Sequence, residues 1–222
     1  MVKERVPETN EGITGEINTS AYDIMMRKLR DRGWIETDMI IKSGIKTGIA
    51  LEIGPGPGYL GLEWLKSTKD TRVKGLEISE DMMKIAQRNS IEYGLQDRIE
   101  YIKGDARKMP FEDNYFDVAF TNGSLHEWEY PEEIMNEIAR VLKPGGRYII
   151  TDMKRNMNPF MKWALWLLAK PKEMRCGLIS SINASYTLSE IEHLVTKTQL
   201  KSSMVTQNMI GIEIAGQKLP AA

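Results

Sequence analysis

The sequence predicts an α/β fold in which a mostly parallel sheet carries helices on both faces. Segments with strand-like and helix-like patterns alternate from residue 49 to residue 151, as is typical of parallel strands joined by crossover helices. Residues 201–206 and 210–215 are predicted as two strands with only a short connection, so one of them runs antiparallel. The 222 residues, 41% of them hydrophobic, suffice for one sizeable core, and we expect a single domain over residues 1–222.

The N-terminal part is expected to begin as a flexible polar segment and to continue as helices. Residues 1–16 are polar and show no clear period. Residues 20–32 are predicted as a helix, because apolar side chains recur at intervals of three and four from Tyr22 to Leu29. A second short helix is predicted over residues 37–43, so we expect an N-terminal helical cap at 17–44.

The central elements are short apolar strands and helices with recognisable ends. Ser79 is a plausible N-cap, Pro131 is placed to begin a helix, and Lys143-Pro-Gly-Gly146 is placed to break one. The predicted strands before the final pair are 49–53, 72–78, 98–103, 115–121 and 147–151. The predicted helices after the N-terminal pair are 59–67, 80–93, 131–142 and 188–197.

Residues 154–186 form a predicted insertion that is too long for a bare connector. Insertions of this length tend to be lids or binding segments, so we expect a lid-like element. Asn158-Pro159 can open a helix whose residues 160–168 are apolar nearly all round. Such a helix must be buried or dock on something, and a substrate lid, a homodimer contact and plain core are the three alternatives.

Composition limits the compartment and the partners. The net charge of −1 gives no bulk attraction to nucleic acid or to an anionic membrane. Cys176 is the only cysteine, so no intramolecular disulfide can form, and a reducing, cytoplasmic location is expected. No apolar signal core stands at the start, and the apolar stretch 163–169 is too short to span a bilayer. Two distant histidines give no metal-ligand pattern, so no metal is expected, although a carboxylate-held Mg²⁺ stays open.

A glycine-rich turn, Gly54-Pro-Gly56-Pro-Gly58, follows the first predicted strand of the sheet. Glycine lets a ligand approach the backbone closely, and ligands of open α/β sheets bind at the carboxyl ends of the strands. The G-x-G-x-G spacing places Tyr59 where a dinucleotide fingerprint requires glycine, and no P-loop G-K-[ST] follows. A purely structural turn is the alternative to a ligand site.

Acidic residues follow the next two strands. Glu77 ends the second strand nineteen residues after Gly58, where an acid can accept both hydroxyls of an adenosine ribose. Asp105 follows the third strand, and its carboxylate can accept an adenine amino group while the Ala106 N–H donates to the ring. A solvated glutamate and an ordinary Gly-Asp turn are the alternatives at each position alone. Their occurrence at successive strand ends favours a binding site.

The chain resembles the class I S-adenosylmethionine-dependent methyltransferases, in the small-molecule branch that includes quinone-biosynthesis C-methyltransferases. The motifs of this resemblance run from about residue 49 to residue 152: Leu51-Glu-Ile-Gly-Pro-Gly-Pro-Gly58, Gly75-Leu-Glu-Ile-Ser79, Gly104-Asp-Ala-Arg-Lys-Met-Pro-Phe111, Phe116-Asp-Val-Ala-Phe120 and Arg140-Val-Leu-Lys-Pro-Gly-Gly-Arg147. The resemblance implies a Rossmann-like sheet of seven strands in the order 3-2-1-4-5-7-6, with strand 7 antiparallel.

The same resemblance implies roles for individual residues and S-adenosyl-L-methionine as the cofactor. Glu77 would bind the ribose, and Asp105 with Ala106 would bind the adenine. Asn122 and Gly123, at the end of the fourth strand, would lie near the sulfonium. The methionine part would be held by Glu52 and by the backbone of Gly54, Gly56 and Gly58.

The acceptor and the chemistry at it are less constrained. His126 is the best candidate for a general base, with capping or packing beside the cofactor as the alternative; Tyr22, Tyr186 and Asp152 are weaker candidates. The Asn/Asp-Pro-Pro-Tyr motif of enzymes that methylate amide or nucleobase nitrogen is absent. We expect a small, apolar or aromatic acceptor and no nucleic-acid partner. A non-catalytic cofactor-binding scaffold and an RNA or protein methyltransferase are the alternatives.

Overall fold

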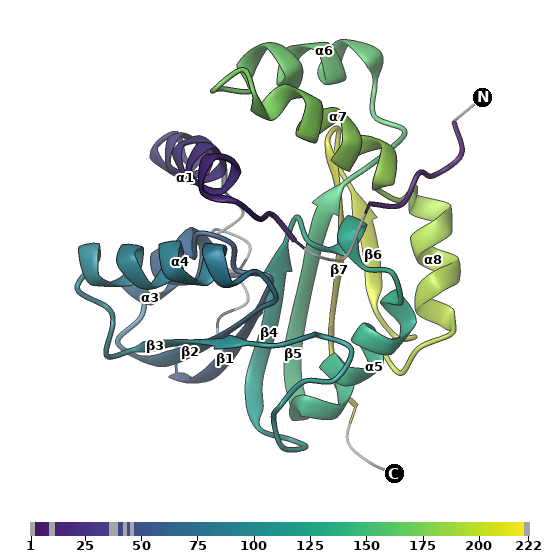
Figure 1. The fold of residues 1–222 in the computed structure, drawn as a ribbon. Helices are drawn as coiled ribbons and strands as arrows, with labels where there is room; N and C mark the ends of the chain where they lie inside the picture. Colours follow the sequence, from purple (N-terminus) through teal and green to yellow (C-terminus); the bar gives the residue numbers. More distant parts are fainter. Residues whose placement is uncertain (1–2, 9–11, 36–39, 42–43, 45–46, 220–222) are drawn as a thin grey trace.

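The computed structural model describes residues 3–8, 12–35, 40–41, 44 and 47–219, and these residues are built around one seven-stranded sheet (Figure 1). The strand order is β3-β2-β1-β4-β5-β7-β6, as the resemblance implied. β7 pairs antiparallel with both β5 and β6, and the other neighbouring strands are parallel. The strands are β1 (Thr47–Ile53), β2 (Asp70–Glu77), β3 (Ile99–Lys103), β4 (Phe116–Asn122), β5 (Leu142–Met153), β6 (Met204–Gln207) and β7 (Gly211–Gln217).

Helices cover both faces of the sheet and bury a separate apolar cluster on each. Alternate residues of β1 illustrate the division, because Leu51 joins the cluster under α5 and α8, whereas Ala50 joins the cluster under α3. The α-helices are α1 (Glu16–Asp31), α3 (Tyr59–Lys66), α4 (Glu80–Glu92), α5 (Pro131–Val141), α6 (Pro159–Leu168), α7 (Met174–Ala184) and α8 (Leu188–Thr196), and η1 (Leu125–Glu127) is a short 3₁₀ helix.

Most element bounds agree with the sequence prediction, and the differences have local causes. The predicted N-cap of α4 is confirmed, since the Ser79 hydroxyl accepts from the Met82 N–H at 3.3 Å. β5 begins at Leu142 instead of at residue 147. Gly145 has a φ of 80° and the β4–β5 register shifts between Phe116 and Val118, so the glycines form an irregularity within the strand. The helix predicted over 37–43 lies largely outside the described residues.

Residues 3–8 are ordered against the rest of the chain, so the prediction of a flexible start is wrong for them. The Val6 N–H donates to the Asn183 carbonyl at 3.1 Å, and the Arg5 guanidinium donates to the His126 carbonyl at 2.9 Å. Arg155 in turn donates to the Lys3 carbonyl at 2.9 Å. These partners lie far away in sequence, which is why a local pattern could not reveal them.

The insertion at 154–186 folds into α6 and α7, which lie with α1 beyond the edge of the sheet where β4 and β5 end (Figure 1). Its two ends meet, because the Arg155 N–H donates to the Tyr186 carbonyl at 3.1 Å. α6 has no buried residue, and its Phe160 and Trp163 are 67% and 55% exposed. The alternative that this helix is plain core is therefore wrong.

Among the described residues, no helix combines the length and the apolar character needed to cross a membrane.

Candidate functional site

A cavity lies at the carboxyl ends of β1, β2 and β4, below α1. The turns that follow these strands form its floor, and Tyr22 and Met26 of α1 form part of its cover. Every residue predicted to bind cofactor lines this cavity except Gly58: Glu52, Gly54, Gly56, Glu77, Asp105, Ala106, Asn122 and Gly123. The sequence-predicted set is thus brought together at one place, as parallel strands require.

Glu77 holds the glycine turn from the end of the neighbouring strand. One carboxylate oxygen accepts from the Gly56 N–H at 2.9 Å, and the other accepts from the Ser79 N–H at 2.9 Å. Burial raises the pKa of Glu77, and these backbone hydrogen bonds oppose the rise. The carboxylate therefore has a fixed orientation at the cavity wall.

Gly58 has a different task from the other glycines of the turn. It is the N-cap of α3 in the left-handed region, with a φ of 82°. A Cβ at this position would lie 2.3 Å from the Tyr101 hydroxyl. Gly58 therefore allows α3 to start close against the sheet, and it does not reach the cavity itself.

Glu52 lines the cavity, and one of its carboxyl oxygens is buried and unsatisfied. Its Oε1 accepts from the Gly61 N–H at 3.2 Å, whereas its buried Oε2 has no hydrogen-bond partner among the described residues. Burial raises the pKa of Glu52 well above its usual range, since the Gly61 N–H offsets only part of the cost and Glu77 adds repulsion. A buried oxygen of this kind calls for a donor or a cation from a ligand.

Asp105 and Ala106 lie on the far side of the cavity from Glu52, after β3. The Asp105 carboxylate is held by the Arg107 guanidinium at 2.6 Å and by the Arg107 N–H at 2.8 Å. These hydrogen bonds lower the pKa of Asp105. Oδ2 accepts from both Nε and Nη2 of Arg107, whereas Oδ1 accepts only from the Arg107 N–H, so Oδ1 can still accept from a ligand amino group.

The cavity wall is rich in carboxyl groups. The described residues that line it include five carboxyl groups and one guanidinium: Glu52, Glu77, Asp105, Glu127, Glu129 and Arg107. The guanidinium is paired with Asp105. Such a wall repels a pyrophosphate and favours a ligand with cationic groups.

Comparisons in sequence and structure agree with this geometry. Residues 51–150 match the family model described as a methyltransferase domain. The ubiquinone/menaquinone biosynthesis C-methyltransferase UbiE of Pseudomonas entomophila is 31% identical over 152 residues, which are 64% of this chain and 57% of that protein. A putative S-adenosyl-L-methionine-dependent methyltransferase from Methanococcus maripaludis has a TM-score of 0.74 at 26% identity, covering 95% of this chain and 99% of that one.

Residues 51–150 thus match a methyltransferase domain, and the fold of the chain is that of the solved S-adenosylmethionine-dependent methyltransferases. The chain spans 57% of the length of the curated relative from Pseudomonas. Geranyl diphosphate C-methyltransferase from Streptomyces coelicolor A3(2), solved with S-adenosyl-L-homocysteine, matches 78% of this chain and 70% of its own with a TM-score of 0.60 at 13% identity. That likeness shows the fold alone.

His126 lies behind the cavity rather than on its wall. It is buried, and its Nδ1 lies 2.9 Å from the Asp152 carboxylate, which also accepts from the His126 N–H at 2.6 Å. Burial lowers the pKa of the ring, but the charge and hydrogen bond of Asp152 outweigh it and raise the pKa to about 9. A general base must be neutral, so that role requires the ring to lose a proton first, and it stays a prediction.

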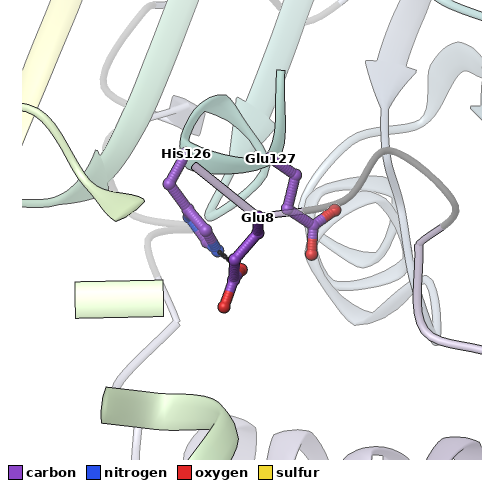
Figure 2. A group of neighbouring side chains, drawn as sticks. All are labelled: Glu8, His126 and Glu127. Atoms are coloured by element: carbon purple, nitrogen blue, oxygen red, sulfur yellow. Dashed lines mark ion pairs between the residues drawn. The ribbon is translucent and has the colours of Figure 1, made fainter. Parts of the chain in front are cut away.

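Several residues around the cavity were predicted in another role or were not predicted. Tyr22, a weaker candidate base from the sequence, lines the cavity. Burial and Glu127 raise its pKa, so its hydroxyl keeps its proton as a donor. Glu127 lines the cavity next to His126, and Glu8 reaches the same place from the N-terminal segment (Figure 2). The position of Glu127 beside His126 was a usable signal, whereas Glu8 had none.

Proposed function

We propose that this protein transfers a methyl group from S-adenosyl-L-methionine to a small, apolar or aromatic molecule. The observation that carries the proposal is the cavity with five carboxyl groups, an unpartnered Glu52 oxygen and a glycine turn fixed by Glu77. The cofactor carries a sulfonium and an ammonium and no phosphate. It therefore fits a wall that would repel a dinucleotide.

The residues on this wall match the parts of the cofactor in order along the sheet. Glu52 offers its free oxygen to the methionine ammonium, and Glu77 faces the ribose hydroxyls. Asp105 and the Ala106 N–H take the adenine edge. Asn122 and Gly123 line the cavity at the end of β4, which lies beside β1, and we place them near the methyl group.

The chain's contribution to the reaction is binding, orientation and exclusion of water. S-adenosylmethionine supplies an activated methyl group for an in-line displacement, so much of the rate can come from positioning. Tyr22 and Met26 of α1 cover the cavity from above. Asp23 of the same helix is held by Tyr59 and Arg88, which fixes α1 over the cofactor.

We propose that 154–186 acts as the lid on the acceptor side and that α6 meets the apolar acceptor. Phe160 and Trp163 contact each other at 5.7 Å between ring centroids and are both largely exposed. An exposed aromatic pair supplies the contact area that an apolar acceptor needs. A homodimer contact through the same helix is the competing use, and light scattering of the purified chain distinguishes the two.

Calorimetry with S-adenosylmethionine, S-adenosylhomocysteine and NAD tests the cofactor. We expect the first two to bind and NAD not to bind at comparable concentration; preference for NAD would overturn the proposal. Metabolite extracts incubated with radiolabelled cofactor then identify the acceptor. Cofactor binding without transfer to any extract would favour the non-catalytic scaffold.

We also propose a cytoplasmic location, for which the exposed free thiol of Cys176 is the support. Cell fractionation tests it.

A further inference from the structure

Three side chains with metal-ligating atoms converge beside the methyltransferase cavity. Glu8 comes from the N-terminal segment, and His126 and Glu127 come from η1 after β4 (Figure 2). One ligand atom from each lies within 4.8 Å of the other two. The His126 Nε2 and a Glu8 carboxylate oxygen are 3.4 Å apart.

The two carboxylates of this group have no lysine or arginine partner among the described residues. The Glu127 carboxylate makes no hydrogen bond and no ion pair with lysine or arginine there. Glu8 receives only a long hydrogen bond of 3.4 Å from the Ser181 hydroxyl, besides facing His126. The nearby Arg5 guanidinium instead lies 4.2 Å from the centre of the Tyr186 ring and donates to the His126 carbonyl. Two carboxylates brought together in this way leave a place for a cation.

The histidine is oriented as a metal ligand. Asp152 at the end of β5 holds the Nδ1 side of the ring at 2.9 Å, and it fixes the same residue through the His126 N–H at 2.6 Å. The Nε2 therefore points toward Glu8. A carboxylate behind one nitrogen and an open second nitrogen is the arrangement that metal-ligating histidines usually show, because the carboxylate sets the tautomer and the ring angle.

We propose that Glu8, His126 and Glu127 bind a divalent transition-metal ion, with Zn²⁺ as the representative. One imidazole nitrogen and two carboxylates form a donor set that suits Zn²⁺, whereas Mg²⁺ prefers an all-oxygen shell. Ligand atoms that each lie about 2.0–2.2 Å from such an ion are closer to one another than the ligand atoms of Glu8, His126 and Glu127 are in this structure. Rotation of the two glutamate side chains toward His126 Nε2 supplies that closure.

The position of this site gives the ion a place in the proposed function, and this consequence rests on that function. Three protein ligands leave a coordination position open, and Glu127 also lines the cofactor cavity. An oxygen or sulfur atom of the acceptor can take the open position, with its proton passing to water. The acceptor would then be held as an anion beside the cofactor.

Metal titration of the full chain, without cofactor or acceptor, tests the site separately from the methyltransferase proposal. After chelator treatment, Co²⁺ serves as a probe through its visible absorption, and Zn²⁺ is then added to displace it. We expect one equivalent to bind, and Mg²⁺ not to compete. Glu8→Gln and Glu127→Gln should each weaken Zn²⁺ binding at least ~10-fold, and Asp152→Asn ~10–100-fold, as loss of a partner behind a ligand does.

Matched variants separate ligation from general charge effects. Glu4→Gln changes an exposed glutamate in the same segment, and His193→Ala removes the other histidine, which is exposed on α8. Both should leave Zn²⁺ affinity within about twofold, while circular dichroism confirms the fold of every variant. Absence of Co²⁺ and Zn²⁺ binding by the wild type, or equal affinity in Glu127→Gln, would overturn the proposal. If the chain binds metal but does not bind S-adenosylmethionine, the proposed function is overturned and the metal site is not.

Discussion

The Asp23 carboxylate of α1 accepts a hydrogen bond of 2.7 Å from the Tyr59 hydroxyl at the start of α3. The same carboxylate accepts from Asn89 at 3.1 Å and from Arg88 at 2.6 Å, both in α4. Asn89 also donates to the Pro57 carbonyl at 2.9 Å. One buried carboxylate therefore ties the cover of the cavity to two helices and to the glycine turn.

Asp23→Asn tests this connection through the pH dependence of stability. Burial raises the pKa of Asp23, but hydrogen bonds from Tyr59, Asn89 and Arg88 outweigh it and hold the pKa below its usual value. The ionised form is thus favoured by folding. Its contribution is present above the unfolded pKa of about 3.9 and is lost as pH falls through the lower folded pKa.

We expect Asp23→Asn to lower the free energy of unfolding at neutral pH by about 1–3 kcal/mol and to flatten its decline in acid. Urea unfolding from neutral to acidic pH measures both effects. Asp31→Asn, an exposed carboxylate on the same helix, is the control. A parallel acid decline in Asp23→Asn and wild type would show that this carboxylate contributes nothing to the pH dependence.

Glu77→Ala should weaken cofactor binding by about 1.5–3 kcal/mol, the range for hydrogen bonds to a charged group. The variant loses the acceptor that faces the ribose and also the bond that fixes Gly56. Calorimetry with S-adenosylhomocysteine gives the affinity, and thermal unfolding confirms that the chain is folded. Glu100→Ala, an exposed strand glutamate, should bind as the wild type does. Unchanged affinity in folded Glu77→Ala would mean that the ribose is held elsewhere.

Gly58→Ala and Gly177→Ala should change stability in opposite directions. At Gly58 the positive φ and the Tyr101 hydroxyl both exclude a Cβ, so we expect a loss of about 2–4 kcal/mol from strain and overpacking together. Gly177 lies inside α7 with nothing within 4 Å of an added Cβ, so alanine should stabilise by about 0.5–1 kcal/mol. Urea midpoints of the two variants give the comparison, and a stable Gly58→Ala would show that α3 can shift.

Trp163→Gln tests the acceptor side of the site. Because the side chain is 55% exposed, we expect little change in stability or in cofactor affinity, and a rise in the acceptor KM. Ile91→Gln changes a similarly exposed apolar residue at the end of α4, away from the cavity. If both variants keep the wild-type KM once the acceptor is known, α6 is an interface rather than a lid.

The fold and the cofactor wall were predictable because their signals are local in the sequence. The glycine turn, Glu77 and Asp105 each follow a strand, and parallel strands bring such positions to one edge without further information. The antiparallel final pair followed from a connection too short for a crossover. The irregular start of β5 was missed, since a Pro-Gly-Gly run marks a break and a bulge equally well.

The N-terminal segment, α6 and the surroundings of His126 depend on contacts between residues far apart in sequence, which no local pattern encodes. Residues 3–8 are polar and aperiodic, and only their partners at Asn183, His126 and Arg155 order them. The apolar residues of α6 predicted burial or docking, and periodicity cannot tell a buried helix from one that covers a site. His126 could be selected from the sequence because histidine is a common general base. Its hydrogen bond with Asp152 could not be predicted, because it depends on the pairing of β4 with β5.

The hydrogen bond between Arg155 and Tyr186 brings together the two ends of the intervening thirty residues. A segment closed in this way can be exchanged as a unit. Both ends are anchored at neighbouring points, so the segment can lengthen, shorten or be replaced by that of another methyltransferase with only a modest change in loop-closure entropy. The glycine turn and the ends of β1 and β2 lie outside this segment, whereas residues 3–8 contact it, as in the hydrogen bond from the Val6 N–H to the Asn183 carbonyl. If this segment is the lid proposed above, the acceptor can diversify here while the turns that would hold the methyl donor are inherited unchanged.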